Sequence, residues 1–303
     1  MAAARWSDMT LQQELAGITC PVVTPFDDAN QIDEDALETV LDDLVSGGID
    51  AVFPNGTTGE FASLSPDERR RVLEFTVEQV GGDVPVVAGA GATSVAETLE
   101  YLEEAADLGA DAAVVVPPYF HAANAPAGNE RFFETVADES PLPLLLYNIP
   151  ACTGGEIAVE TVEAVAEHDN VVGLKDSSGD LEYFLAAMRA TPDEFLLLQG
   201  YDALLLPSLR MGADGGVNAL SNAVPEAYSE LYETAETERG ATLQDAIADL
   251  FEACGAYGFA PATKAALEHR DVIPTDAVRP PLVTVPDDGC AAIEDAVEGV
   301  LEA

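Results

Sequence analysis

The chain has 303 residues, with 56 acidic against 12 basic side chains and a formal net charge of −44. This charge argues against nucleic acid or an anionic membrane surface as a partner, because both would repel it. Hydrophobic residues make up 48% of the chain, and the acids are spread along it, which argues against disorder. A folded protein with a large core is predicted.

The positive charge is divided unevenly, because only Lys175 and Lys264 are lysines and the other basic residues are arginines. A carboxylate-rich surface with almost no lysine stays hydrated in concentrated salt, where charge repulsion is screened within a few ångströms. We interpret the composition as adaptation to high salt. An unusually acidic protein of ordinary salinity is the alternative.

Cysteine and histidine spacing indicates neither a disulfide framework nor a metal site. No two of the four cysteines form a CxxC pair, and His121, His168 and His269 stand singly. We therefore expect no metal site. The first fifteen residues contain no apolar signal region, and no run of 18 apolar residues occurs, so a cytoplasmic location is predicted.

Short apolar runs rich in β-branched residues alternate with helical patterns along the whole chain. The predicted strands are Ile18–Thr24, Ala51–Pro54, Val84–Ala88, Ala112–Val116, Leu144–Tyr147, Val171–Lys175, Phe195–Gln199 and Gly215–Val217. The last of these rests on the weakest pattern, because the final units are short.

The segments between these strands have helical signals. Apolar residues from Leu37 to Val45 follow the i, i+3, i+4 spacing of one helix face. Ser65-Pro66-Asp67-Glu68 and Ser94-Val95-Ala96-Glu97 are capping boxes that begin the next two helices. Gly47-Gly48 and Gly109 end helices before strands.

Strand followed by helix, eight times without a linker, predicts parallel strands in a (β/α)₈ TIM barrel. A doubly wound open sheet is the competing fold, but the first strand continues into Thr24-Pro25-Phe26 and not into a glycine-rich phosphate loop. We predict the barrel over residues 1–241. Residues 242–303 form a helical extension packed on it, with helices at Leu243–Cys254, Pro261–His269 and Ala291–Leu301.

Polar residues follow several of these strands, where a barrel enzyme has its active site. Lys175 ends a strand that is buried on both faces, so its amine must point into the barrel mouth. A buried amine that gives up its proton can form a Schiff base with a ketone. The structural alternative is an ion pair with a carboxylate such as Asp176. Because the chain avoids lysine almost everywhere, we favour the catalytic role.

Two further groups could assist such an amine. Tyr147 ends the neighbouring strand and could relay protons, although a core tyrosine with a satisfied hydroxyl is the commoner case. Gly56-Thr57-Thr58-Gly59 offers backbone N–H groups and two hydroxyls that suit a carboxylate, although the motif alone could be an ordinary turn. Lys264 begins a C-terminal helix and is interpreted as structural or at the rim of the site.

Several motifs in order resemble the dihydrodipicolinate synthase / N-acetylneuraminate lyase family. The three central ones are GTTGE at 56–60, YNIPACTG at 147–154 and GLKDSSGD at 173–180. VVTPFDDANQID, the segment 198–222 and PATKAAL also resemble it, so the resemblance covers nearly the whole chain.

This resemblance implies a Schiff-base lysine acting on pyruvate or another 2-oxo acid, in a barrel that is usually a homotetramer. By resemblance Lys175 is that lysine and Tyr147 the proton relay. Thr57 and Thr58 then bind the substrate carboxylate. The backbone at Gly200 and Val217 lies near the imine. No cofactor is implied.

The sequence departs from the synthase pattern at two positions. Synthases of this family typically have an arginine where Cys152 stands, and it binds the aldehyde's carboxylate. They also lend a second tyrosine across a subunit contact, where this chain has Phe120 in Pro118-Tyr119-Phe120. Without its bidentate partner, a carboxylate loses bonds of about 1.5–3 kcal/mol.

We therefore favour an aldolase that cleaves 2-keto-3-deoxygluconate, or its 6-phosphate, to pyruvate and a glyceraldehyde. No arginine for a 6-phosphate occurs in residues 119–125, which favours the unphosphorylated substrate, although Arg131 could substitute. The alternative is a 4-hydroxy-tetrahydrodipicolinate synthase that condenses pyruvate with aspartate semialdehyde. A barrel that only binds a sugar acid is the third hypothesis.

Overall fold

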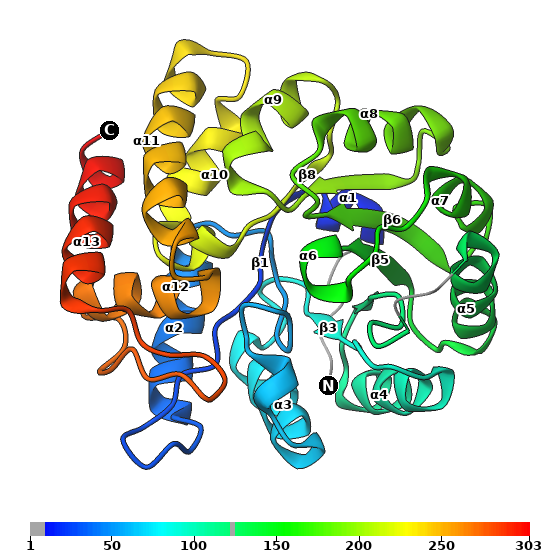
Figure 1. Cartoon of the computed structure of the whole chain (residues 1–303), viewed down its shortest axis with the longest axis horizontal. Coiled ribbons are helices and arrows are strands. Elements are labelled where there is room, and N and C mark those ends of the chain that lie inside the picture. Colours follow the sequence, from blue (N-terminus) through cyan, green and yellow to red (C-terminus); the bar gives the residue numbers. More distant parts are fainter. Residues whose placement is uncertain (1–9, 122–124) are drawn as a thin grey trace.

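The computed structural model describes residues 10–121 and 125–303, and in this part of the chain eight parallel strands form the predicted barrel (Figure 1). The strands are β1 Gly17–Cys20, β2 Ala51–Val52, β3 Val87–Gly89, β4 Ala112–Val115, β5 Leu144–Asn148, β6 Val171–Asp176, β7 Leu196–Gln199 and β8 Gly215–Val217. Their order is β2-β1-β8-β7-β6-β5-β4-β3. A parallel bridge between Val52 and Val86 joins the two end strands and brings the barrel almost to closure.

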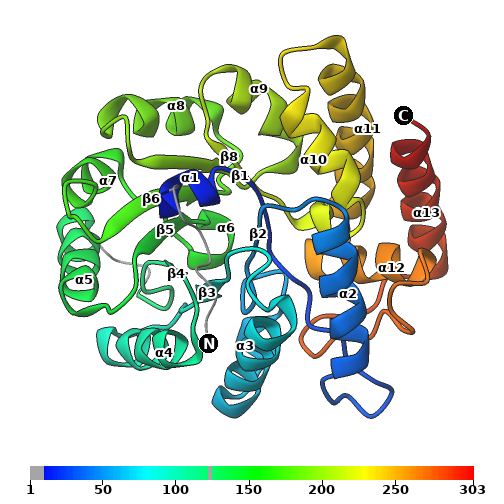
Figure 2. The ribbon, with the colours of Figure 1, turned by 180° about the vertical axis from the view of Figure 1, so that it is seen from behind.

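Helices surround the strands, as the alternating pattern predicted (Figures 1 and 2). They are α1 Leu11–Leu15, α2 Glu34–Ser46, α3 Pro66–Val80, α4 Val95–Leu108, α5 Pro126–Glu139, α6 Pro150–Thr153, α7 Val159–Val165, α8 Leu181–Ala190, α9 Leu205–Arg210, α10 Pro225–Glu233, α11 Glu238–Gly255, α12 Phe259–His269 and α13 Asp287–Glu302. Short 3₁₀ turns occur at η1 Phe61–Ser63, η2 Asp202–Leu204 and η3 Ala219–Asn222.

The local signals in the sequence explain where several elements begin. The capping box of Ser65 and Glu68 is present in full at the start of α3. Ser94 caps α4 through the backbone N–H of Glu97, 3.3 Å away. Most predicted strands are slightly longer than the observed ones, but Gly215–Val217, the weakest prediction, has the observed bounds of β8.

Two hydrophobic clusters hold the barrel together. The larger one lies between the strands and the surrounding helices. The smaller one fills the barrel interior with side chains such as Phe53, Leu145, Tyr147 and Leu198. Leu15 of α1 belongs to this inner cluster, and α1 lies across the end of the barrel seen in Figure 2. The opposite end, at the carboxyl termini of the strands, is the end where an active site is expected in a barrel of this kind.

The C-terminal helices α11, α12 and α13 lie together at one side of the barrel, next to α2 and α10 (Figure 1). Their buried residues, among them Ile247, Ala266 and Ile293, belong to the same large cluster as the barrel helices. Helix α11 begins at Glu238, a turn before the predicted Leu243. The division at residues 241 and 242 into barrel and extension stays a prediction.

Glycine at 215 sets how closely β8 approaches β1. A Cβ added to Gly215 would lie 1.9 Å from the backbone oxygen of Gly17, whereas one added to Gly299 on α13 would have no heavy atom within 4 Å. We expect Gly215→Ala to lower the free energy of unfolding by about 1–3 kcal/mol. Gly299→Ala should raise it by about 1 kcal/mol through helix propensity. Urea denaturation of both variants measures this, and equal stabilities would contradict it.

Candidate active site

Lys175 and Tyr147 lie side by side at the carboxyl ends of β6 and β5, where their Cα atoms are register partners. Alternation along β6 turns Lys175 inward and Leu174 outward, towards the helices. The Lys175 side chain is 4% exposed. Its Nζ lies 4.1 Å from the ring centroid of Tyr147 and 5.2 Å from that of Phe53. The amine therefore lies inside the barrel and faces two aromatic rings.

The proposed structural alternative for Lys175, an ion pair with Asp176, is wrong. Asp176 is the next residue on β6 and accepts hydrogen bonds from Asn148 Nδ2 at 2.7 Å and from the N–H and hydroxyl of Ser178 at 3.1 and 2.9 Å. Among the described residues, no carboxylate forms an ion pair with Lys175 Nζ. Asp176 instead ties the end of β6 to the end of β5.

Gly200 and Val217 lie where the sequence placed them, at the ends of β7 and β8. A Cβ on Gly200 would lie 3.1 Å from Lys175 Cε and 2.2 Å from Ser177 Oγ. A side chain at position 200 would therefore collide with Ser177 and crowd the lysine side chain. Val217 is buried in the inner cluster with Tyr147.

The Thr57–Thr58 turn follows β2, and Gly56 at its start lies close to the aromatic ring that the lysine faces. A Cβ on Gly56 would lie 3.1 Å from the Phe53 ring that Lys175 Nζ faces. The turn is held in place, because Glu60 N–H donates to Thr57 O at 3.1 Å and Thr24 Oγ1 donates to Gly59 O at 2.8 Å. Neither threonine hydroxyl is hydrogen-bonded to any residue that the structure describes; Thr57 lines the pocket beside the turn, and Thr58 is 6% exposed.

A pocket of about 250 Å³ opens beside this turn. Its lining is mainly apolar and includes no basic side chain: Thr57, Glu60, Phe61, Ala62, Ser63, Val116, Tyr119, Ile149, Cys152, Thr153, Pro281 and Leu282. Cys152 comes from α6, at the position that distinguishes this chain from the synthase pattern. Charge on Lys175 lowers the pKa of the Cys152 thiol, although burial raises it overall. The thiol thus lies within electrostatic reach of the amine.

The second lysine is fully buried and paired. Lys264 Nζ lies 2.5 Å from Glu60 Oε1, and both side chains are 0% exposed. Burial lowers the pKa of Lys264 to about 8, against the opposing effect of Glu60. The sequence analysis identified Lys264 as structural or at the rim but missed its partner, the last residue of the GTTGE motif. Its place among the apolar residues of α12 was the available signal for burial.

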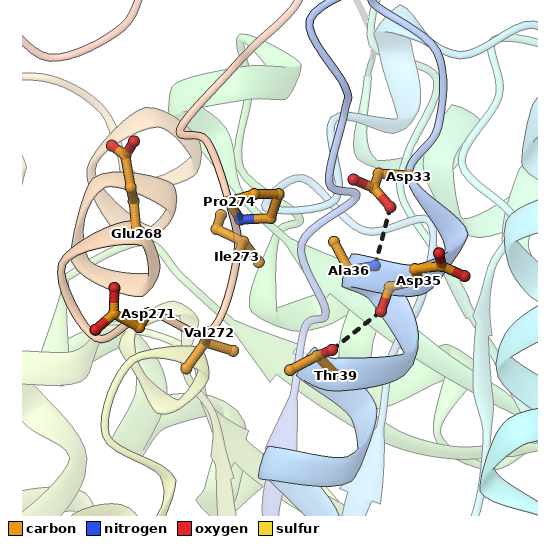
Figure 3. Close-up of a pocket in the computed structure, with 9 residues that line it drawn as sticks. All are labelled: Asp33, Asp35, Ala36, Thr39, Glu268, Asp271, Val272, Ile273 and Pro274. Atoms are coloured by element: carbon orange, nitrogen blue, oxygen red, sulfur yellow. Dashed lines mark hydrogen bonds between the residues drawn. The ribbon is translucent and has the colours of Figure 1, made fainter.

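A second hollow, of about 550 Å³, lies between the start of α2 and residues 268–274 (Figure 3). Four carboxylates line it, from Asp33, Asp35, Glu268 and Asp271. Asp33 is occupied as the cap of α2, because it accepts from Ala36 N–H at 3.0 Å. As with the 250 Å³ pocket, neither lysine lines this hollow, but here the carboxylates would repel an anionic 2-oxo acid.

The predicted absence of a phosphate-binding arginine concerns residues 119–125, of which 122–124 lie outside the described residues. Arg131, the suggested substitute, lies exposed on α5. Over residues 10–121 and 125–303, no group of three or more His, Cys, Asp or Glu side chains is arranged to hold a metal ion. In the same ranges, no helix has the length and apolar character needed to cross a membrane.

Comparison with known proteins identifies the family. Residues 14–299 match the Dihydrodipicolinate synthetase family. A DapA-like lyase of Halobacterium salinarum is 39% identical over 283 residues, which cover 92% of each chain. A 4-hydroxy-tetrahydrodipicolinate synthase of Methanopyrus kandleri is 41% identical over 224 residues, 73% of this chain and 74% of the other.

Solved structures agree with this result. The 4-hydroxy-tetrahydrodipicolinate synthase of Methylacidiphilum fumariolicum superposes with a TM-score of 0.90 at 32% identity, covering 95% of this chain and 96% of the other. YagE of Escherichia coli, solved in complex with pyruvate, has a TM-score of 0.90 at 28% identity and covers 95% and 99%.

The fold and the family define a carbon–carbon lyase of the Schiff-base-forming type. The chain belongs to the dihydrodipicolinate synthase family. The family resemblance in the sequence is thereby confirmed. The more specific likeness to 2-keto-3-deoxygluconate aldolases is not supported by the relatives' names, which include several synthases.

Burial of the Asp176 carboxyl makes the free energy of unfolding depend on pH. Burial raises the pKa of this carboxyl from the usual 3.8 to about 6, despite the hydrogen bonds from Asn148 and Ser178. The folded state therefore holds the proton more tightly than the unfolded chain does. Ionisation lowers the free energy of unfolding as pH rises from 3.8 to about 6, and the loss is complete above that.

Asp176→Asn should remove this dependence. One pKa unit corresponds to about 1.4 kcal/mol, so the stability difference, variant minus parent, should rise by about 2 kcal/mol between pH 4 and pH 7. Urea denaturation at constant salt over this pH range measures the difference. A difference that stays constant with pH would show that Asp176 is ionised as easily in the folded protein as in the unfolded chain.

Proposed function

We propose that the protein forms or breaks the carbon–carbon bond between pyruvate and an aldehyde, through a Schiff base on Lys175. The observation that supports this most directly is the enclosed Nζ, 4.1 Å from the Tyr147 ring centroid at the barrel mouth. The hydroxyls of Thr57 and Thr58 supply donors for the carboxylate. That YagE was solved with pyruvate adds support from a relative of the same fold.

In the cleavage direction, the unprotonated Lys175 Nζ attacks C2 of the keto acid, and the carbinolamine loses water to give a protonated imine. Tyr147, in its role as proton relay, accepts the C4 hydroxyl proton as the C3–C4 bond breaks. The bonding electrons move into the imine, and the aldehyde leaves. The remaining enamine is protonated at C3, and water hydrolyses it to pyruvate and the free lysine.

The relatives' names favour aspartate semialdehyde as the aldehyde. One relative named 4-hydroxy-tetrahydrodipicolinate synthase, from Natronomonas pharaonis, is 41% identical over 239 residues, 78% of this chain and 81% of the other. On this ground a synthase is the first candidate, and it is the alternative of the sequence analysis. The reaction would then run as a condensation.

The lining of the pocket favours a different aldehyde. Cys152 replaces the arginine expected in a synthase, and no basic side chain lines the 250 Å³ pocket. A carboxylate bound there would be desolvated without a charged partner. A glyceraldehyde released from 2-keto-3-deoxygluconate has hydroxyls in place of that carboxylate. Cleavage of this sugar acid is therefore the second candidate.

We also propose a homo-oligomer without a cofactor, acting in the cytoplasm. Phe120 is 83% exposed beside the pocket residue Tyr119, so its ring is free to pack against a second subunit. In the family resemblance this segment lies at a subunit contact, and light scattering of the parent enzyme measures the subunit number. Because the chain belongs to a lyase family, a purely binding barrel is not proposed.

Borohydride reduction tests the Schiff base directly. With pyruvate present, we expect reduction to attach pyruvate to Lys175, identified by mass spectrometry of the proteolytic peptide. Lys175→Met should show neither adduct nor turnover. Tyr147→Phe should still form the adduct but lose about 10²–10⁴-fold in turnover, because only the proton relay is removed. An adduct on another residue, or none, would contradict the proposal.

A substrate panel separates the two candidates. Turnover with pyruvate plus aspartate semialdehyde supports the synthase, and cleavage of 2-keto-3-deoxygluconate or its 6-phosphate supports the aldolase. Because the pocket lacks a basic side chain, we expect Cys152→Arg to raise kcat/KM for aspartate semialdehyde about tenfold or more. Cys152→Leu is the uncharged control. Equal values for the two variants would show that the aldehyde's carboxylate binds elsewhere.

A further inference from the structure

The buried pair of Glu60 and Lys264 has no part in the chemistry proposed above. Both side chains are 0% exposed, although Glu60 is also one of the residues that line the 250 Å³ pocket. Lys264 Nζ also donates to Ala277 O at 2.8 Å and lies 4.1 Å from the ring centroid of Phe26. Burying such a pair gains little stability over an apolar pair of the same volume. A role in fixing geometry explains its presence better than a role in stability.

Glu60 connects this pair to the turn that carries Thr57 and Thr58. Its backbone is left-handed, with φ 54°, which is uncommon for a residue other than glycine. The turn packs closely against the loop that follows β1: a Cβ added to Gly59 would lie only 2.8 Å from Val22 O. The bond from Lys264 holds Glu60 in this conformation, and Glu60 N–H in turn bonds to Thr57 O.

The second carboxylate oxygen of Glu60 accepts a hydrogen bond from the segment that forms another wall of the pocket. Arg279 N–H donates to Glu60 Oε2 at 3.0 Å, and the Arg279 guanidinium binds both carboxylate oxygens of Glu68 on α3, at 3.0 and 2.7 Å. Arg279 lies two residues before Pro281 and Leu282, which line the pocket. In Figure 1 this segment, between α12 and α13, runs towards α3. One carboxylate therefore holds two walls of one pocket.

We infer that Glu60 and Lys264 are positioning residues, which set the affinity of the site for the carboxylate of a 2-oxo acid by fixing the Thr57–Thr58 turn against the Pro281–Leu282 wall. The inference rests on the proposed function, because it needs the two threonines to bind that carboxylate. It assigns a role in binding and none in the chemical step. Loss of the pair should therefore weaken pyruvate binding and leave the rate at saturation nearly unchanged.

The double variant Glu60→Gln with Lys264→Met tests this, because it removes both charges together and leaves no ion unpaired in the core. Borohydride trapping of pyruvate on Lys175 is measured against pyruvate concentration. We expect the half-saturating concentration to rise tenfold or more, with the maximal trapping rate within threefold of the parent. The control is Asp43→Asn with Arg270→Met, which removes an ion pair of 2.9 Å between α2 and the end of α12. It should keep the parent's half-saturation.

If the double variant does not fold, the single variant Glu60→Gln tests the inference. An amide can accept from Lys264 but then presents its NH₂ group to the Arg279 N–H, so one of the two bonds is lost. Its half-saturation should rise at least threefold. A folded variant with the parent's half-saturation overturns the inference alone, as does a rise of equal size in the control. Absence of any adduct in the parent overturns the proposed function and this inference with it.

Discussion

The structure depends on keeping two lysine side chains out of water in a chain of net charge −44. Both lysines are buried, Lys175 at 4% exposure and Lys264 at none. A buried ammonium is costly unless something compensates for lost hydration. Lys264 has a carboxylate at 2.5 Å, whereas Lys175 has two aromatic faces and no ion pair among the described residues. The same barrel therefore holds one lysine in an ion pair and one whose amine is available for reaction.

That difference follows from the places of the two residues in the fold. Lys175 ends a strand, so its side chain points along the barrel towards the mouth, where glycine at 200 leaves it space. Lys264 lies on α12 outside the strands, and its amine reaches the turn after β2. The hydrogen bonds of Asn148 and Ser178 with Asp176 keep the ends of β5 and β6 together. These contacts fix Tyr147 against Lys175.

The sequence predicted what local patterns determine. Alternating apolar runs predicted the barrel, including the short strand Gly215–Val217. The glycines of this strand permit its close approach to β1. Positions at strand ends gave Lys175 and Tyr147 as neighbours. The Glu60–Lys264 pair could not be found in this way, since its members are 204 residues apart and no periodicity links them. The hydrogen bonds that hold the Thr57–Thr58 turn, from Thr24 and Glu60, could not be found from the motif either.

The acidic surface sets a condition on how an anionic keto acid reaches the site. A net charge of −44 repels such a substrate at long range in dilute salt. At about 1 M salt the screening length falls to about 3 Å, and only charges inside the mouth still act on the substrate. Since Lys175 and the donors of the Thr57–Thr58 turn lie inside, binding would then depend on them and not on the surface. Adaptation to high salt, as predicted from the composition, would thus suit a site whose donors for the carboxylate lie on the Thr57–Thr58 turn inside the barrel mouth.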